Sequence, residues 1–218
     1  MAERDRLIQK VQTPALPIPK PGPLKQYLDD LNNILRLFFN LLTNIVNTVF
    51  GQLGGRFLST PNALYFSTVD QPIAVVNTGQ VISFENTYLQ SGISINGGTD
   101  SQITAVYSGV YNVQFSAEIA STSANSKIVY VWIARDGVDL GYTAKQFILS
   151  GASDIRNLTY NFNLDFVAGE YLEMKWSSDS LDAELNTQVA TAAHPAVASA
   201  VITVTFVSAL PEVRPTPP

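Results

Sequence analysis

The chain has 218 residues, of which 46% are hydrophobic and 10% aromatic, and this is enough to form a sizeable core. Only 14% of the residues are charged, the net charge is -5, and the seven basic residues beyond position 53 form no cluster, which excludes nucleic acid as an expected partner. The absence of cysteine excludes disulfides and thiolate metal sites.

Residues 1–23 are predicted to form an extended arm, because closely spaced prolines disfavour both a helix and a central strand. We expect this arm to anchor the protein to a larger assembly. The residues assigned to the anchor are Arg4, Arg6, Pro14, Pro17, Pro19 and Pro21. A spacer ordered by the protein's own oligomer is the alternative. The arm lacks the apolar core of a secretory signal, so we expect synthesis in a host cytoplasm.

Residues 24–53 carry an apolar heptad repeat, which predicts a coiled-coil stalk roughly 45 Å long. Apolar residues at the flanking e and g positions make this face too wide for two strands and favour three. The a and d positions, predicted to line the trimer interface, are Leu28, Leu31, Leu35, Phe38, Leu42, Ile45 and Val49. A helix packed on its own domain is the alternative. Membrane insertion is not expected, because Arg36, Asn40 and Asn47 would lie in hydrocarbon.

A glycine and proline hinge at residues 54–63 precedes a region with two-residue alternation, which predicts strands. The expected strands are residues 64–68, 73–76, 81–84, 92–95, 102–107, 110–119, 128–135, 147–149, 157–166, 171–177 and 200–207. Turn signals separate them, and no helix intervenes, so residues 64–208 should form an antiparallel sandwich or barrel. Residues 209–218 form a proline-rich tail.

The strand at residues 128–133 differs from its neighbours because both of its faces are apolar. Ile128, Tyr130 and Trp132 share one face, and Val129, Val131 and Ile133 share the other. Burial on both faces indicates a layer beyond the core, and a neighbouring subunit would supply it. We therefore assign Val129, Val131 and Ile133 to the trimer interface.

Three segments carry a family resemblance: SGVYNVQF at 108–115, VWIARDG at 131–137, and residues 164–172, which include Ala168, Gly169 and Glu170. Together with the last strand they resemble the trimeric jelly-roll heads of the tumour necrosis factor and complement globular-head superfamily, in the shorter form seen in bacteriophage particle proteins. The segment LNNILRLFFN at 31–40 is similar to stalk helices of tailed-phage structural proteins. The resemblance implies a mainly β fold: an antiparallel, TNF-like jelly roll behind a coiled-coil helix and a proline-rich arm.

No catalytic or cofactor motif stands out. His194 is the single histidine and precedes a proline in a loop without a nucleophile elbow, so we do not expect it to be catalytic. Asp179, Asp182 and Glu184 provide hard oxygen ligands, but their spacing does not match a calcium loop. We predict no metal and no cofactor.

Together these features favour a non-enzymatic, homotrimeric structural protein of a phage virion, a fibre or capsid decoration that its arm attaches to other virion proteins. The alternative is a receptor- or glycan-binding adhesin that uses the loops at residues 121–126 and 177–182 on a host surface. A polysaccharide depolymerase is the third hypothesis: the fourteen acids beyond position 53 leave room for a catalytic pair, but no pair of them stands out.

Overall fold

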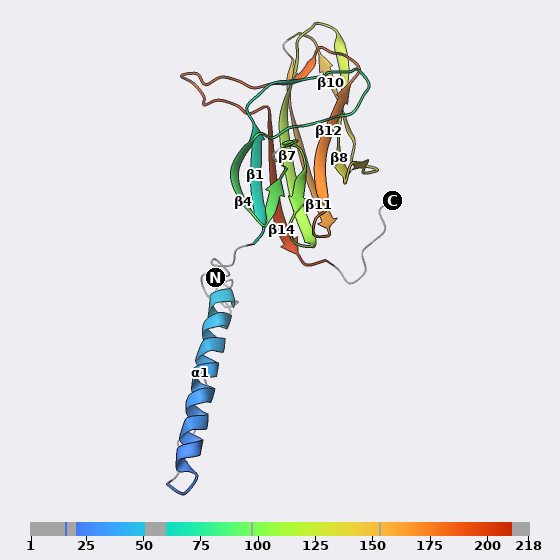
Figure 1. Ribbon diagram of the computed structural model, residues 1–218. Helices are drawn as coiled ribbons and strands as arrows, with labels where there is room; N and C mark the ends of the chain where they lie inside the picture. Colours follow the sequence, from blue (N-terminus) through green and yellow to red (C-terminus); the bar gives the residue numbers. More distant parts are fainter. Residues whose placement is uncertain (1–15, 17–20, 51–59, 97, 153, 211–218) are drawn as a thin grey trace, which may run out of the picture. The chain divides into compact units, whose positions relative to one another are not determined.

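The computed structural model describes residues 16, 21–50, 60–96, 98–152 and 154–210, with the side chains of residues 48–50 also outside the description. The contacts divide the chain into two units, residues 1–59 and residues 60–218. The first contains one long helix and the second contains the strands (Figure 1).

Helix α1 spans Lys25–Phe50 and lies within the predicted stalk. It begins two residues after Pro23, and prolines are tolerated at the start of a helix because the first helical turn leaves its N–H groups unpaired. The Lys25 backbone N–H donates to Gly22 O at 3.0 Å, and an ion pair of 2.9 Å joins Lys25 to Asp29 one turn later. The predicted helical segment is therefore helical over these 26 residues.

The second unit is built of antiparallel strands in two sheets. Sheet A has the order β2-β13-β7-β14-β1-β4, with β11 also paired to β7, and sheet B has the order β10-β8-β12-β6-β5, with β3 beside β12 and β9 beside β8. The strands are β1 (Asn62–Ser67), β2 (Gln71–Pro72), β3 (Gln80–Val81), β4 (Asn86–Ser91), β5 (Ile93–Ile95), β6 (Ile103–Ala105), β7 (Gly109–Ser121), β8 (Ser126–Arg135), β9 (Val138–Asp139), β10 (Lys145–Ser150), β11 (Ile155–Phe166), β12 (Tyr171–Ser178), β13 (Ala183–Leu185) and β14 (Ala200–Ser208).

Eight of these strands define the topology of the sandwich. In chain order they are β1, β6, β7, β8, β10, β11, β12 and β14. Sheet A contains, side by side, the first, eighth, third and sixth of these eight strands, which are β1, β14, β7 and β11. Sheet B contains, side by side, the second, seventh, fourth and fifth, which are β6, β12, β8 and β10. This is the strand order of a jelly roll, in which hairpins of the two sheets wind around one core. The predicted jelly-roll sandwich is thus confirmed by the strand pairing.

The core lies between the two sheets. Alternate side chains of β7 point inward from sheet A, among them Tyr111, Val113 and Phe115, and all are buried. The phenol of Tyr160 on β11 donates to the backbone carbonyl of Val131 on β8, so a hydrogen bond crosses from one sheet to the other. Trp176 of β12 is fully buried on the opposite side of the same core.

Several strand details differ from the prediction, among them the strand expected at residues 81–84, in whose place β3 covers Gln80–Val81. Residues 73–76 are not a strand, because Gln80 uses its side chain to bond Ala74 N–H and Pro72 O at 2.9 Å each, in place of ladder hydrogen bonds. Strand β4 was not predicted, because its side chains are mostly exposed and show no apolar alternation. Strand β13 was not predicted either, because its three residues follow a turn signal directly.

Candidate association surfaces

The apolar stripe of α1 is exposed along the helix. Among the predicted seam residues, Phe38 is 58% exposed and Ile45 is 54% exposed, while Leu28, Leu31 and Leu42 are also exposed and Leu35 is half-buried. The side chain of Val49 lies outside the described residues. An apolar face of this size on a helix normally packs against something, so α1 presents an association surface.

The predicted anchor can be followed only at one point. Pro21 lies exposed in the bend before α1. Arg4, Arg6, Pro14, Pro17 and Pro19 lie outside the residues that the structure describes. The anchoring role of the arm therefore stays a prediction.

The assignment of Val129, Val131 and Ile133 to a subunit interface was wrong. All three are fully buried inside the protein's own sandwich, where they face sheet A, so a neighbouring subunit cannot reach them. The opposite face of β8 presents Tyr130, which is 41% exposed, and the partly exposed Trp132. The sequence showed that both faces of this strand were apolar, but it could not show which face met the core.

The outward side of sheet A carries almost no charge. We define the sheet A outer face as Asn62, Leu64, Phe66, Asn112, Gln114, Ser116, Thr159, Asn161, Asn163, Val201, Thr203 and Thr205. The register places these side chains side by side across β1, β14, β7 and β11. Two acids, Glu118 and Asp165, lie toward opposite ends of this face, and between them the described outward positions of these four strands are uncharged.

Amide side chains on this face bond to one another. Asn112 Nδ2 donates to Asn161 Oδ1 at 2.6 Å and to Asn163 Oδ1 at 2.9 Å, and Gln114 Nε2 donates to Asn112 Oδ1 at 2.9 Å. Beside this ladder lies a hollow of about 330 Å³. It is lined by residues of β7, β11 and β14, among them Thr159 and Val201. Fixed amides, small hydroxyls and aliphatic side chains are typical of a surface that can pack closely without burying charge.

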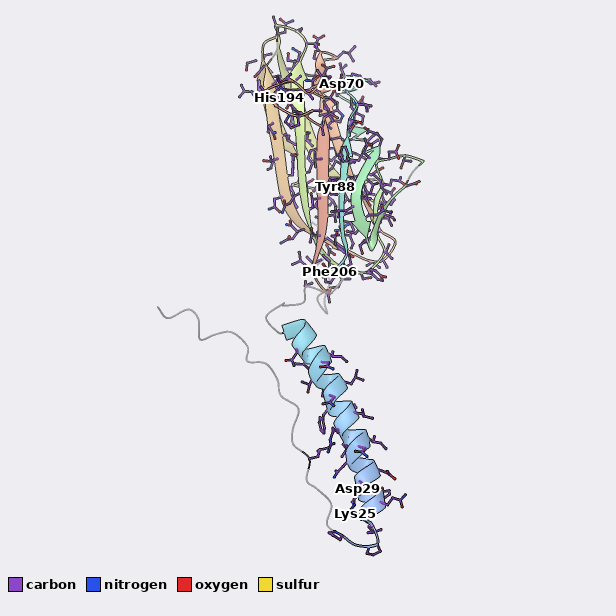
Figure 2. The ribbon with its side chains drawn as sticks, turned by 90° about the vertical axis from the view of Figure 1, so that its left-hand side faces the viewer. Lys25, Asp29, Asp70, Tyr88, His194 and Phe206 are labelled. Carbon is purple, nitrogen blue, oxygen red and sulfur yellow. The ribbon has the colours of Figure 1, made fainter. Side chains whose placement is uncertain are left out.

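Figure 2 labels four residues of the second unit, which we call the head: Asp70 and His194 lie at one end, Phe206 lies at the other, and Tyr88 lies between them. At the end marked by Asp70, the loops at residues 121–126 and 177–182 meet. Thr122 N–H donates to Asp182 O at 2.9 Å, and Ser123 Oγ donates to Asp182 Oδ2 at 2.8 Å. The two loops that the adhesin hypothesis singled out therefore form one hydrogen-bonded surface.

The acids considered for calcium are engaged separately. Asp179 Oδ1 accepts the Ile128 N–H at 2.9 Å, and Asp182 accepts serine hydroxyls. The pKa of Glu184 is raised, first by burial and then by the charge of Asp70. No group of three or more metal-ligating side chains was found among the described residues. His194 Nδ1 lies 2.8 Å from the carbonyl oxygen of Pro195 in the loop between β13 and β14.

A second hollow, of about 360 Å³, lies on the outward face of sheet B, and no sequence pattern had pointed to it. We call it the aromatic hollow, and its lining residues are Tyr130, Trp132, Asp139, Leu140, Gly141, Tyr142, Ala144 and Ser177. Tyr142 and Asp139 lie beyond the hairpin turn that follows β8, and Ser177 comes from β12. Only strand pairing brings these separated positions together.

Within the described residues, no helix combines the length and the apolarity needed to span a bilayer.

No protein-family model matches the chain, and no curated protein matches it. Among solved structures, the chain is similar to the globular domain of zebrafish complement 1qA protein, with 12% identity and a TM-score of 0.44 over 70% of this chain and 100% of that one. It is also similar to Eiger TNF from S. frugiperda, with 8% identity and a TM-score of 0.46 over 72% of this chain and 99% of that one. Likenesses this slight transfer no property of those proteins to this chain.

Proposed function

We propose that this chain is a non-enzymatic structural protein that forms a homotrimer through α1 and the sheet A outer face. We further propose that the trimer is a fibre or capsid decoration on a bacteriophage particle, held to other virion proteins by residues 1–23. The observation that carries the proposal is the exposed apolar seam of α1, with Phe38 58% exposed at its middle.

Three copies suit the helix better than two. Besides the a and d positions, Ile34 and Leu41 at g are 65% and 61% exposed, so the apolar stripe is wider than a two-stranded seam covers. At 1.5 Å per residue, the 26 residues of α1 form a rod of about 39 Å. Packing three such stripes together would remove these side chains from water.

The sheet A outer face supports a second contact between the same copies. Removing water from a charged side chain is costly unless the charge is paired, and this face has uncharged amides, hydroxyls and aliphatic groups in its place. Its Asn112 ladder already satisfies part of the polar groups that a contact would bury. In this proposal the face takes the role that the sequence had suggested for Val129, Val131 and Ile133.

Assignment to a phage particle rests on sequence features. The segment at 31–40 is similar to stalk helices of tailed-phage structural proteins, and a proline-rich arm precedes the stalk. An arm, a stalk and a jelly-roll head in that order suit a protein that attaches at one end and projects at the other.

The test is the mass of the full chain in solution, measured by analytical ultracentrifugation at micromolar concentration. We expect a trimer. Phe38→Ala should weaken it sharply, since three symmetry-related cavities would form at roughly 3 to 5 kcal/mol for each truncated buried aromatic. Asn33→Ala, on the opposite side of the helix, is the matched control and should leave the mass unchanged. A monomeric wild-type chain would overturn the proposal, and equal effects of both substitutions would show that the heptad register is wrong.

A receptor- or glycan-binding adhesin is the second candidate, because Asp182 joins the two end loops into one surface. The exposed Ala124 lies within this surface. If the end loops contact a host, the full chain binds host cells, and Ala124→Arg abolishes binding without changing the mass, because the long charged side chain blocks close approach. Retention on particles without any binding to cells would favour decoration alone.

A further inference from the structure

We propose that the aromatic hollow on sheet B binds a pyranose sugar. A pyranose has apolar C–H faces that stack on aromatic rings, and hydroxyl groups at its edge that both donate and accept hydrogen bonds. The hollow offers both kinds of partner. Its aromatic side chains are Tyr130, Trp132 and Tyr142, and its polar groups come from Asp139 and Ser177.

The aromatic part is fixed at one side and open at the other. The indole of Trp132 lies directly on the backbone of Gly79, where a Cβ would come within 2.7 Å of the ring, so the ring cannot shift toward β3. Tyr142, by contrast, is 93% exposed, and its φ of 61° is unusual for a bulky residue. A large aromatic held outward in a strained backbone conformation is typical of a contact site.

In the polar part of the hollow, the negative charge of Asp139 is balanced by the positive charge of Lys175. Lys175 Nζ lies 3.0 Å from Asp139 Oδ1 and donates to Gly137 O at 3.2 Å. Partial burial acts to raise the pKa of Asp139, but the Lys175 ammonium paired with it helps to lower the pKa on balance. The carboxylate is thus ionised and paired, and the hollow has no net charge to attract a bare cation or anion. A neutral ligand rich in hydroxyls suits this pair, because it can donate to the carboxylate.

The location makes this proposal independent of the trimer. The aromatic hollow lies on sheet B, and the sheet A outer face lies on the other sheet of the sandwich. Association through sheet A would leave the hollow open. Apart from Ser177, the first residue of the range 177–182, the hollow shares no lining residue with the end loops, which carry the adhesin alternative.

The experiment uses the full chain and a panel of methyl pyranosides of glucose, galactose, mannose and N-acetylglucosamine. Binding is measured by saturation-transfer NMR and by quenching of Trp132 fluorescence, with Trp132→Phe separating this signal from that of the buried Trp176. We expect saturable binding of at least one sugar in the millimolar range that is usual for so small a contact.

Tyr142→Asn should weaken that binding about tenfold while preserving the fold, because asparagine tolerates positive φ. Tyr88→Asn is the matched control, since Tyr88 is 75% exposed on β4 of the other sheet, and binding should stay unchanged. Failure of every sugar to bind, or equal weakening by both variants, would overturn the proposal. Tighter binding of choline than of any sugar would overturn the ligand class. Ultracentrifugation of each variant keeps the result separate from that on the trimer.

Discussion

At the scale of single residues, Lys127 is the most unusual side chain of the head. It is 1% exposed, and its ammonium donates to Ser121 Oγ at 2.7 Å, to Ser123 O at 2.9 Å and to Asn125 O at 2.7 Å. Ser121 is the last residue of β7, and Ser123 and Asn125 belong to the turn that leads to β8. A buried ammonium is costly unless its hydrogen bonds are satisfied, so this residue holds the turn in one conformation.

Replacing Lys127 by methionine keeps the apolar stem and removes the ammonium. We expect the free energy of unfolding to fall by about 2 kcal/mol, because the three oxygen acceptors lose a charged donor. Urea unfolding measures the change. Lys145→Met is the matched control: Lys145 is exposed, and a single hydrogen bond of 3.3 Å and a contact with the Tyr160 ring hold it. The control should cost less than about 1 kcal/mol, and a similar loss in both variants would contradict this account of Lys127.

The lowered pKa of Glu85 predicts how the stability of the fold depends on pH. Burial acts to raise its pKa, but hydrogen bonds from the Thr68 N–H and from the Ser67 and Thr68 hydroxyls outweigh burial and lower it below 4.5. A lowered folded-state pKa means that Glu85 stabilises the fold above about pH 4.5 and that this contribution disappears as the pH falls through the folded-state pKa. Glu85→Gln should therefore reduce the drop in melting temperature between about pH 6 and about pH 3.

Glu184 is the control, because its pKa is shifted in the opposite direction from that of Glu85. Its pKa is raised, so its ionised form opposes folding, and protonation removes that opposition as the pH falls. Glu184→Gln should enlarge the same drop in melting temperature. Calorimetry of the two variants decides the matter: changes in the same direction would contradict the assigned directions of the two pKa shifts.

Residue identity alone predicted some contacts and missed others. The alternation of Tyr111, Val113 and Phe115 correctly predicted one buried face, because polar side chains occupied the other. In β8 the faces were both apolar, and the choice of Val129, Val131 and Ile133 for the interface failed because periodicity does not say which face meets the core. The aromatic hollow was missed because its residues lie on separate strands and a loop.

At the scale of elements, α1 was predictable because its signal is local and repeated, whereas the short strands depend on partners far away in the chain. The three residues of β13 pair with β7 and β2, and nothing in their own sequence marks them as a strand. The exposed strand β4 pairs with β1 at the edge of sheet A. Edge strands of this kind lack a hydrophobic pattern, which is why sequence periodicity did not detect this one.

The proposed role of the sheet A outer face can be tested within one strand. Thr203→Lys places a charge on β14 in the middle of that face. If the face is a subunit contact, the lysine loses its bound water without gaining a partner. The dissociation constant of the oligomer should then rise at least about tenfold, measured by ultracentrifugation over a dilution series. Thr104→Lys introduces the same charge at a partly exposed position on β6 of sheet B and should leave association unchanged. A Thr203→Lys chain that associates as tightly as wild type would exclude the face from the contact.

At the scale of the whole molecule, attachment and association are predicted to be separate properties. Deleting residues 2–23 removes the arm but leaves α1 and every strand intact. We expect the shortened chain to remain trimeric, with a nearly unchanged melting temperature, and to lose its incorporation into particles. Normal incorporation of the shortened chain would mean that attachment lies elsewhere, with the tail at residues 209–218 as the next candidate.

The position of β14 has a consequence for the order in which the protein folds. This strand is the last in the described part of the chain, yet it lies between β1 and β7, and through it β1 and β4 are joined to the rest of sheet A. Contacts between distant parts of a chain form slowly, while a helix forms from neighbours within microseconds. During synthesis α1 is therefore complete long before sheet A can close. A chain that stops before residue 200 would keep its helix but leave β1 and β4 without the strand that ties them to β7.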